Sequence, residues 1–394
     1  MAAGRSELWI VYAGAFFSLS ILQMVALATP LYAGELGLSP VVLGIVVGCR
    51  SISPMIYSIH FGAVMDTVGV RRVLLLFAGI CIVVPPLYPA FPQIPVLIIL
   101  QLMLGLAAAV VWIASQTLIA RAGGGETRQT VHFSIVAAAG STIGPLLLGL
   151  AWQAGGPWGG YGLITLWAVP LFCSGLLLKT RTDVPRRALS WRDALPSAPA
   201  YVAAWRILAR PVGAFVIACT FMRLAGVGMI ESFYPVQLRE WGYGSAVIGG
   251  LVATGNLVSL PASLATDWWV KITGSARRAL LTSLAASTLS LTVVPWLDGI
   301  VQLAIAMCVF GFGLGVSMPL VLVILSQGLP ADQQGVAAGL RGTANRLAAF
   351  ILPVMMGLAA QLAGLSASFW IVGFALLAGL LLMAYVSRNL HVGK

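Results

Sequence analysis

The sequence predicts an all-α polytopic membrane protein with twelve transmembrane helices in two pseudo-symmetric six-helix bundles. Three observations support this prediction: the composition, the number of long apolar segments and an internal repeat. Of the 394 residues, 60% are hydrophobic and only 8% are charged, against roughly 45–50% apolar and 25% charged residues in a soluble domain. A soluble protein could not hide so much apolar surface and keep enough charge on its exterior.

The apolar segments come in two groups of six. A bilayer core needs about 20 apolar helical residues to be crossed, and the first segments that meet this test are 8–33, 40–61, 72–91, 95–120, 130–153 and 161–178. The segments of the second group are 211–238, 244–269, 278–297, 300–326, 335–362 and 366–387. We therefore expect an N-terminal bundle at 1–178, a cytoplasmic linker at 179–210 and a C-terminal bundle at 211–394.

The loops between these segments carry an asymmetric charge. With a cytoplasmic N-terminus, 17 basic residues fall on the inner side and Arg239 alone falls on the outer side. Basic residues concentrate in cytoplasmic loops, so we expect both termini to be cytoplasmic in a bacterial-type inner membrane. The excess of positive charge, +11 overall, then faces anionic lipid. Because it is spread over many loops, it does not indicate a nucleic-acid partner.

Enzyme signatures are missing from the sequence. The five cysteines stand singly and the three histidines are far apart, which predicts no metal site and no disulfide framework. The glycine run Gly311-Phe312-Gly313-Leu314-Gly315 lies inside an apolar segment, without the preceding strand of a dinucleotide site. We therefore expect no cofactor and no enzymatic activity, and a channel is a less favoured alternative.

Two stretches of the chain repeat each other. The segment 145–153 matches 353–361 at the same place in the fifth and eleventh predicted spans. An aspartate and a basic pair also follow the second and eighth spans, as Asp66 with Arg71-Arg72 and as Asp267 with Arg277-Arg278. Two copies of a six-helix unit are a transporter signature.

The loop after the second span carries a family motif. Its sequence, Gly62-Ala63-Val64-Met65-Asp66-Thr67-Val68-Gly69-Val70-Arg71-Arg72, resembles the signature loop of the major facilitator superfamily. The resemblance implies a secondary active transporter, usually monomeric, that works by alternating access. It also implies a gating role for Gly62, Asp66, Gly69, Arg71 and Arg72, with Asp267 as the repeat of Asp66. An aspartate at a helix end can accept from the N-terminus of a neighbouring helix.

A second motif lies in the fifth span. Gly140, Gly144, Pro145 and Gly149 resemble the glycine-proline motif of the drug and metabolite antiporter branch, which implies a gating role for them as well. Small residues spaced by four let helices approach closely. However, the first and fourth spans lack an acidic residue, and Gln101 stands where many proton-coupled relatives carry an arginine. Proton-coupled efflux of drugs or other lipophilic compounds is therefore the alternative function.

Charged residues inside the predicted spans indicate a substrate site. A charge near the bilayer centre costs at least ~2.5–3.5 kcal/mol, and Arg50, Arg223 and Arg346 fall near mid-depth with Glu231 as the accompanying acid. Three arginines against one acid would give the cavity a positive field. We therefore expect a small anionic or zwitterionic solute that bears a carboxylate or phosphate. The competing interpretation pairs Arg223 with Glu231 and leaves the other arginines to carbonyls or water.

Further polar and aromatic residues complete the predicted lining of the cavity: Asn345, Gln23, Trp112, Tyr234 and Asn256. Glu231 is the best candidate for carrying a proton, although a neighbouring arginine would oppose its protonation. The sequence leaves open whether protons or a counter-transported anion drive the transport.

Overall fold

The computed structural model describes residues 5–122, 127–178, 207–328 and 334–389. In these ranges the chain is helical, without strands. It divides into two compact units. The described residues of unit 1 fall within Met1–Gly37, Cys49–Leu195 and Leu238–Ala253, and those of unit 2 fall within Leu38–Gly48, Pro196–Gln237 and Thr254–Lys394. The predicted linker 179–210 lies outside the described residues except for its last four positions.

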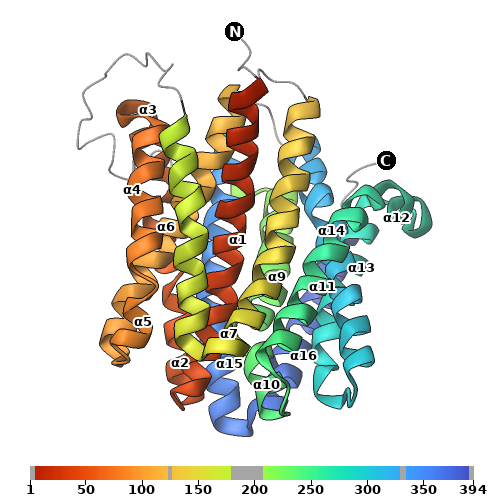
Figure 1. Ribbon diagram of the computed structural model, residues 1–394. Coiled ribbons are helices and arrows are strands. Elements are labelled where there is room, and N and C mark those ends of the chain that lie inside the picture. The colour runs from red at the N-terminus through yellow and green to blue at the C-terminus, as the bar shows by residue number, and fades with distance from the viewer. Residues whose placement is uncertain (1–4, 123–126, 179–206, 329–333, 390–394) are drawn as a thin grey trace. The chain divides into compact units, whose positions relative to one another are not determined.

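The helices of unit 1 run alongside one another (Figure 1). Their bounds are Arg5–Glu35 (α1), Ile52–Val68 (α3), Val70–Val83 (α4), Leu87–Ala90 (α5), Ile94–Ala122 (α6) and Thr127–Leu177 (α7). The α1 helix packs against α6 and α7, and α4 packs against the same two helices. The 51-residue α7 contains the fifth and sixth predicted spans, because the chain turns at Gly156, where φ is 57° and ψ is −147°.

Unit 2 is built from a second set of packed helices. Their bounds are Pro211–Ser232 (α9), Thr266–Thr273 (α12), Ala276–Thr292 (α13), Ile300–Gly328 (α14), Gln334–Ala363 (α15) and Leu365–Val386 (α16), with short 3-10 turns at Val294–Trp296 (η1) and Ser387–Asn389 (η3). The α9 helix packs against α13, α14 and α15. Three helices include residues of both units: Pro40–Cys49 (α2), Tyr234–Glu240 (α10) and Ser245–Leu264 (α11).

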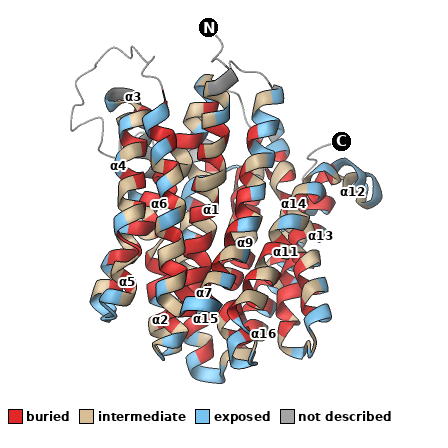
Figure 2. Ribbon diagram, in the orientation of Figure 1, coloured by how far each residue is buried: buried red, intermediate tan, exposed pale blue. Residues whose placement is uncertain are grey.

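The twelve predicted spans each correspond to helical chain. Among the described residues, ten stretches are long and apolar enough to cross a membrane. One of them, Arg128–Leu177, has 50 residues and contains two spans, and the 17-residue α13 covers most of predicted span 278–297. Many large apolar residues along the helices are exposed. Figure 2 marks the exposed positions in pale blue. This pattern fits contact with lipid, which does not penalise exposed apolar groups.

The second predicted span is broken at Arg50, between α2 and α3. Pro54 explains the break, because it has no amide hydrogen for the Arg50 carbonyl and its ring clashes with that carbonyl in a regular helix. On α6, Gly105 makes room for the irregular backbone, since a Cβ there would collide with the Arg50 carbonyl oxygen. Arg50 is thus held against α6 within unit 1.

Glycines of the fifth span allow α7 to approach its neighbours. A Cβ on Gly140 would collide with the Phe16 carbonyl of α1, and one on Gly144 would lie 2.5 Å from the Ser20 hydroxyl oxygen. Farther along α7, Gly149 lies against the Ser245 carbonyl of α11. The predicted close approach is therefore present within unit 1.

The internal repeat reappears in the packing of unit 2. Gly357, the repeat of Gly149, lies against the Pro40 carbonyl of α2. Gly44 in turn lies against the carbonyl of Pro353, which is the repeat of Pro145. The two copies of the sequence motif therefore make the same kind of backbone contact, each within its own unit.

We predict that Gly140→Leu lowers the free energy of unfolding by about 1–3 kcal/mol, because the side chain has no room against α1. The matched control is Gly162→Leu on the same helix, where a Cβ meets nothing within 4 Å. Thermal melting of the purified protein in detergent measures both variants. Equal melting temperatures for the two variants would contradict this packing.

Candidate functional site

The signature-loop residues take different positions in the structure. Gly69 ends α3 with φ at 99°, a left-handed region that favours glycine. Gly62 and Asp66 lie in α3, and the Asp66 side chain lies outside the described residues. Arg72 is exposed at the start of α4, and Asp267 is exposed in the first turn of α12.

Arg71 caps the end of a neighbouring helix. Its Nε donates to the Gly175 carbonyl at 3.0 Å, and its Nη2 donates to the Leu176 carbonyl at 2.9 Å. The last carbonyls of a helix have no amide partner inside the helix, and a cation near them is also favoured by the helix dipole. Arg71 therefore stabilises the C-terminus of α7.

Arg277 repeats this arrangement in unit 2. Its Nη2 donates to the Ala384 carbonyl at 2.6 Å, and its Nε donates to the Ser387 hydroxyl at 2.9 Å. Ala384 lies in the last turn of α16 and Ser387 directly follows that helix. Gly175 likewise lies in the last turn of α7, the last span of the first half. The arginine of each repeat thus has a capping partner, and the gating role of the loop stays a prediction.

The polar candidates of unit 1 surround α6. Gln101 is buried, and its Nε2 donates to the Thr29 hydroxyl at 2.5 Å. Arg50 packs its side-chain stem on Gly105, one turn further along α6. Arg50 therefore lies one helical turn from Gln101, the position at which many proton-coupled relatives carry an arginine.

The two other candidates of unit 1 have ordinary surroundings. Gln23 is partly buried on α1, and Trp112 is partly buried on α6. The Trp112 ring stacks on Phe133, with the ring centroids 5.7 Å apart. This packing explains the position of Trp112 without a substrate.

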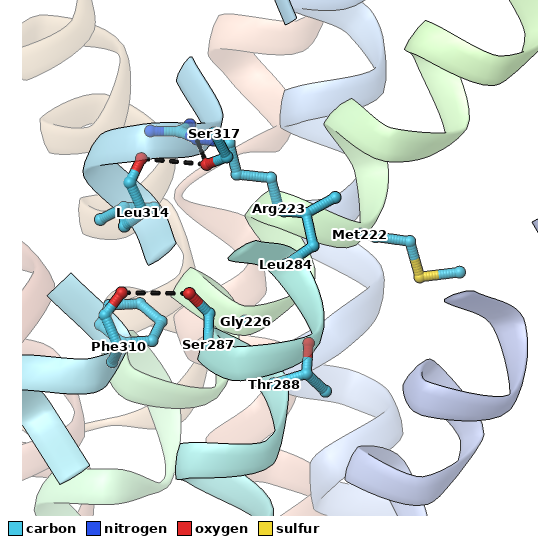
Figure 3. Close-up of a pocket in the computed structure, with 9 residues that line it drawn as sticks. All are labelled: Met222, Arg223, Gly226, Leu284, Ser287, Thr288, Phe310, Leu314 and Ser317. Atoms are coloured by element: carbon cyan, nitrogen blue, oxygen red, sulfur yellow. Dashed lines mark hydrogen bonds between the residues drawn. The ribbon is translucent and has the colours of Figure 1, made fainter. Parts of the chain in front are cut away.

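Arg223 is held by a neutral partner in unit 2. It lies on α9, about 18 Å along the helix from Pro211, and its Nε donates to the Ser317 hydroxyl of α14 at 3.2 Å. Figure 3 shows the Arg223 side chain reaching Ser317 beside a small gap. The gap has about 10 Å³ of free space and is lined by Met222, Arg223, Gly226, Leu284, Ser287, Thr288, Phe310, Leu314 and Ser317.

Arg341 lies near Arg223, although it was not among the predicted site residues. The two side chains reach adjacent residues of α14, since Arg223 contacts Ser317 and Arg341 contacts Met318. The Nη1 of Arg341 lies 3.7 Å from the Met318 sulfur, and its Nε is buried without a hydrogen-bond partner. Across the described ranges no carboxylate forms a salt bridge with either arginine. Asp332, the acid nearest to Arg341 in the sequence, lies outside these ranges.

Asn345 belongs to the same face of α15. It lies four residues after Arg341, so the two side chains are neighbours on the helix surface, and its buried Oδ1 also has no hydrogen-bond partner. Arg346 is partly buried on α15. Its position, five residues after Arg341, is rotated by about 140° around the helix axis. The structure therefore brings Arg341 and Asn345 together and turns Arg346 to another face.

The remaining candidates also lie in unit 2. Glu231 is partly buried near the end of α9, and Tyr234 is fully buried at the start of α10. Asn256 is partly buried on α11. Their participation in a substrate site stays a prediction.

Comparison with known proteins decides the family. The sequence model described as Major Facilitator Superfamily matches residues 8–353 and 216–392. The chain belongs to this superfamily. No curated protein matches the chain.

Solved structures agree with the fold of the superfamily. A mutant of the nucleoside transporter NupG is 13% identical, with a TM-score of 0.82 over 98% of this chain and 100% of that one. NupG itself is 13% identical, with a TM-score of 0.77 over 97% and 98% of the two chains. The family indicates a multi-pass membrane transporter rather than an enzyme, and these neighbours share its fold.

We predict that Arg71→Gln and Arg277→Gln each lower the free energy of unfolding by about 1–2 kcal/mol, because both remove charged donors from helix carbonyls. The control is Arg72→Gln. Because the Arg72 side chain is exposed, this substitution should lower the free energy of unfolding by less than about 0.5 kcal/mol. Thermal melting measures the three variants. If Arg72→Gln were as destabilising as the other two, the loss would reflect loop charge and not capping.

Proposed function

We propose that this superfamily member moves a small organic anion or zwitterion by secondary active transport, and that Arg223 and Arg341 bind its carboxylate or phosphate. One observation carries the proposal. The Arg223 and Arg341 side chains reach adjacent residues of α14 in the span region, and their hydrogen-bond partners in the described part of the chain are the Ser317 hydroxyl and the Met318 thioether. One of them, Arg341, also has a buried N–H without an acceptor.

The electrostatic argument favours an anionic ligand at this place. Two like charges in a medium of low dielectric constant raise each other's energy, and a buried charge is ordinarily paired. An anion between the arginines would reverse the sign of both interactions. Arginine binds carboxylate and phosphate through paired N–H donors, and the free Nε of Arg341 would supply one of them.

The size of the gap restricts where such a ligand can lie. The space of about 10 Å³ beside Arg223 holds about one water molecule, which is too small for an organic solute. The solute would therefore contact the part of the Arg223 side chain that this gap does not enclose, since that residue is only partly buried. A single water in the gap is compatible with the Ser317 hydrogen bond.

Two other substrate classes compete with the anion. NupG is named as a nucleoside transporter, and a neutral nucleoside would need no pair of arginines. Lipophilic drugs are the substrate of the efflux alternative, but the glycines that resemble the exporter motif already make close contacts with α1 and α11. The two arginines therefore favour the anion over both alternatives.

The other expectations belong to the same proposal. We place the protein as a monomer in a bacterial-type inner membrane with both termini in the cytoplasm, since the basic residues concentrate on one side. Bundles 1–178 and 211–394 would alternate access, joined by the linker 179–210. Protons, with Glu231 as a candidate carrier, and a counter-transported anion remain the two candidates for coupling.

A thermal-shift screen of the full-length protein tests the substrate class. The panel contains carboxylates and phosphate esters, neutral nucleosides and lipophilic cations. A ligand at 100 times its Kd stabilises the native state by about 2.7 kcal/mol, so we predict a rise of a few degrees with at least one anion. Arg223→Gln and Arg341→Gln should each abolish the shift.

The matched control is Lys271→Gln, which removes an exposed cation of α12 and should keep the anion-induced shift. Stabilisation by nucleosides or lipophilic cations alone, retained in both arginine variants, would contradict the anion site.

A further inference from the structure

One end of unit 1 is predicted to face outward. At this end an ion pair joins two parts of the chain that are far apart in the sequence. The carboxylate of Glu35, the last residue of α1, accepts from Arg239 Nη2 at 2.6 Å. The same oxygen, Oε1, accepts from Trp152 Nε1 at 2.8 Å. Arg239 lies on α10 and Trp152 on α7. The second half of the chain is thereby tied to two helices of the first half.

An aromatic cluster holds the acceptor in place. The Trp152 ring is buried and packs against Tyr32 and Tyr161, with centroid distances of 6.4 and 5.6 Å. Tyr161 in turn stacks on Tyr88 at 4.6 Å. Because these large rings pack tightly, Trp152 presents its N–H in a fixed direction. The Glu35 carboxylate is therefore oriented before Arg239 reaches it.

The ion pair borders an open cleft of about 450 Å³. The side chains of Glu35 and Arg239 are 21% and 39% exposed, so water can reach both. An exposed ion pair adds little free energy to the state in which it is formed. Its contribution corresponds to no more than about a fivefold change in an equilibrium constant. An interaction of this strength can be formed and broken repeatedly.

The chain segment under the ion pair belongs to unit 1 through its contacts. Leu238–Ala253 is part of unit 1, whereas the following Thr254–Lys394 is part of unit 2. The Ala246 amide donates to Gln153 Oε1 at 3.2 Å, and the Ser245 carbonyl lies against Gly149. These contacts join the start of α11 to α7. They hold Leu238–Ala253 against α7, next to the ion pair.

Alternating access requires this segment to move. In transporters of this architecture the two repeats move against each other around a fixed site, and α11 is continuous from Ser245 to Leu264. When the outer end opens, Leu238–Ala253 must leave α7. Arg239 then leaves Glu35.

We propose that Glu35 and Arg239, with Trp152 as the positioning residue, form a latch that keeps the outer end closed. The latch breaks in each transport cycle. It rests on the alternating access and the membrane orientation proposed above, and not on the substrate class.

A double-mutant cycle read out by thiol labelling tests the latch. Ser245→Cys places a thiol at a buried position under the ion pair, and a membrane-impermeant maleimide added outside intact cells labels it only when the segment opens. The protein without Ser245→Cys gives the background from the native cysteines. Glu35→Gln, Arg239→Gln and the double variant are then compared in the Ser245→Cys protein.

The latch predicts that each single substitution raises the labelling rate about two- to fivefold. The double variant should label no faster than the faster single variant, because either substitution breaks the same interaction. Trp152→Phe, which keeps an aromatic ring but removes the N–H donor, should also raise the labelling rate. The control Glu240→Gln removes the neighbouring exposed acid on α10 and should leave the rate unchanged.

Unchanged labelling in both single variants, or additive effects in the double variant, would overturn the proposal. Labelling from the cytoplasmic side alone would also overturn it, because this end would then face inward. None of these readouts uses a substrate, so a failed latch and a failed anion site are distinguished.

Discussion

The cost of keeping charged groups away from bulk water determines how this protein uses its arginines. Near the ends of helices, Arg71 and Arg277 offset this cost by donating to backbone carbonyls that have no amide partner within their helix. At the predicted outer end, Arg239 is neutralised by Glu35. Deeper in unit 2, Arg223 and Arg341 are stabilised only by neutral groups among the described residues. That difference separates structural arginines from the pair that we assign to substrate.

Much of the fold could be predicted from the sequence, because the bilayer imposes simple rules on it. Span length follows from the thickness of the bilayer, and the predicted and observed helices agree within a few residues at most ends. The fifth and sixth spans are one helical run with a turn at Gly156, since the predicted loop is helical up to that glycine. The sequence alone showed that Gly357 repeats Gly149. The structure shows why both are glycine, because a Cβ at either position would collide with a backbone carbonyl of a neighbouring helix.

The site was harder to predict, because it depends on how helices are rotated and on what faces them. Depth along the span pointed to Arg346, yet depth does not say which face of α15 a residue occupies. The buried, unpartnered Nε of Arg341 became visible only with its neighbours in place. Arg239 was counted as the lone outer cation, and its partner Glu35 lies far away in sequence. The break at Arg50, in contrast, has a local cause in Pro54 that sequence reasoning could have used.

Counterflow in proteoliposomes tests the anion site most directly. Vesicles are loaded with an excess of one unlabelled carboxylate or phosphate ester, and the same labelled compound is added outside at trace concentration. If the protein exchanges an anion at the arginine pair, label accumulates transiently above its equilibrium level with wild type and not with Arg341→Gln. Accumulation of a neutral nucleoside, with no counterflow of any anion, would show that the arginine pair does not bind an anionic substrate.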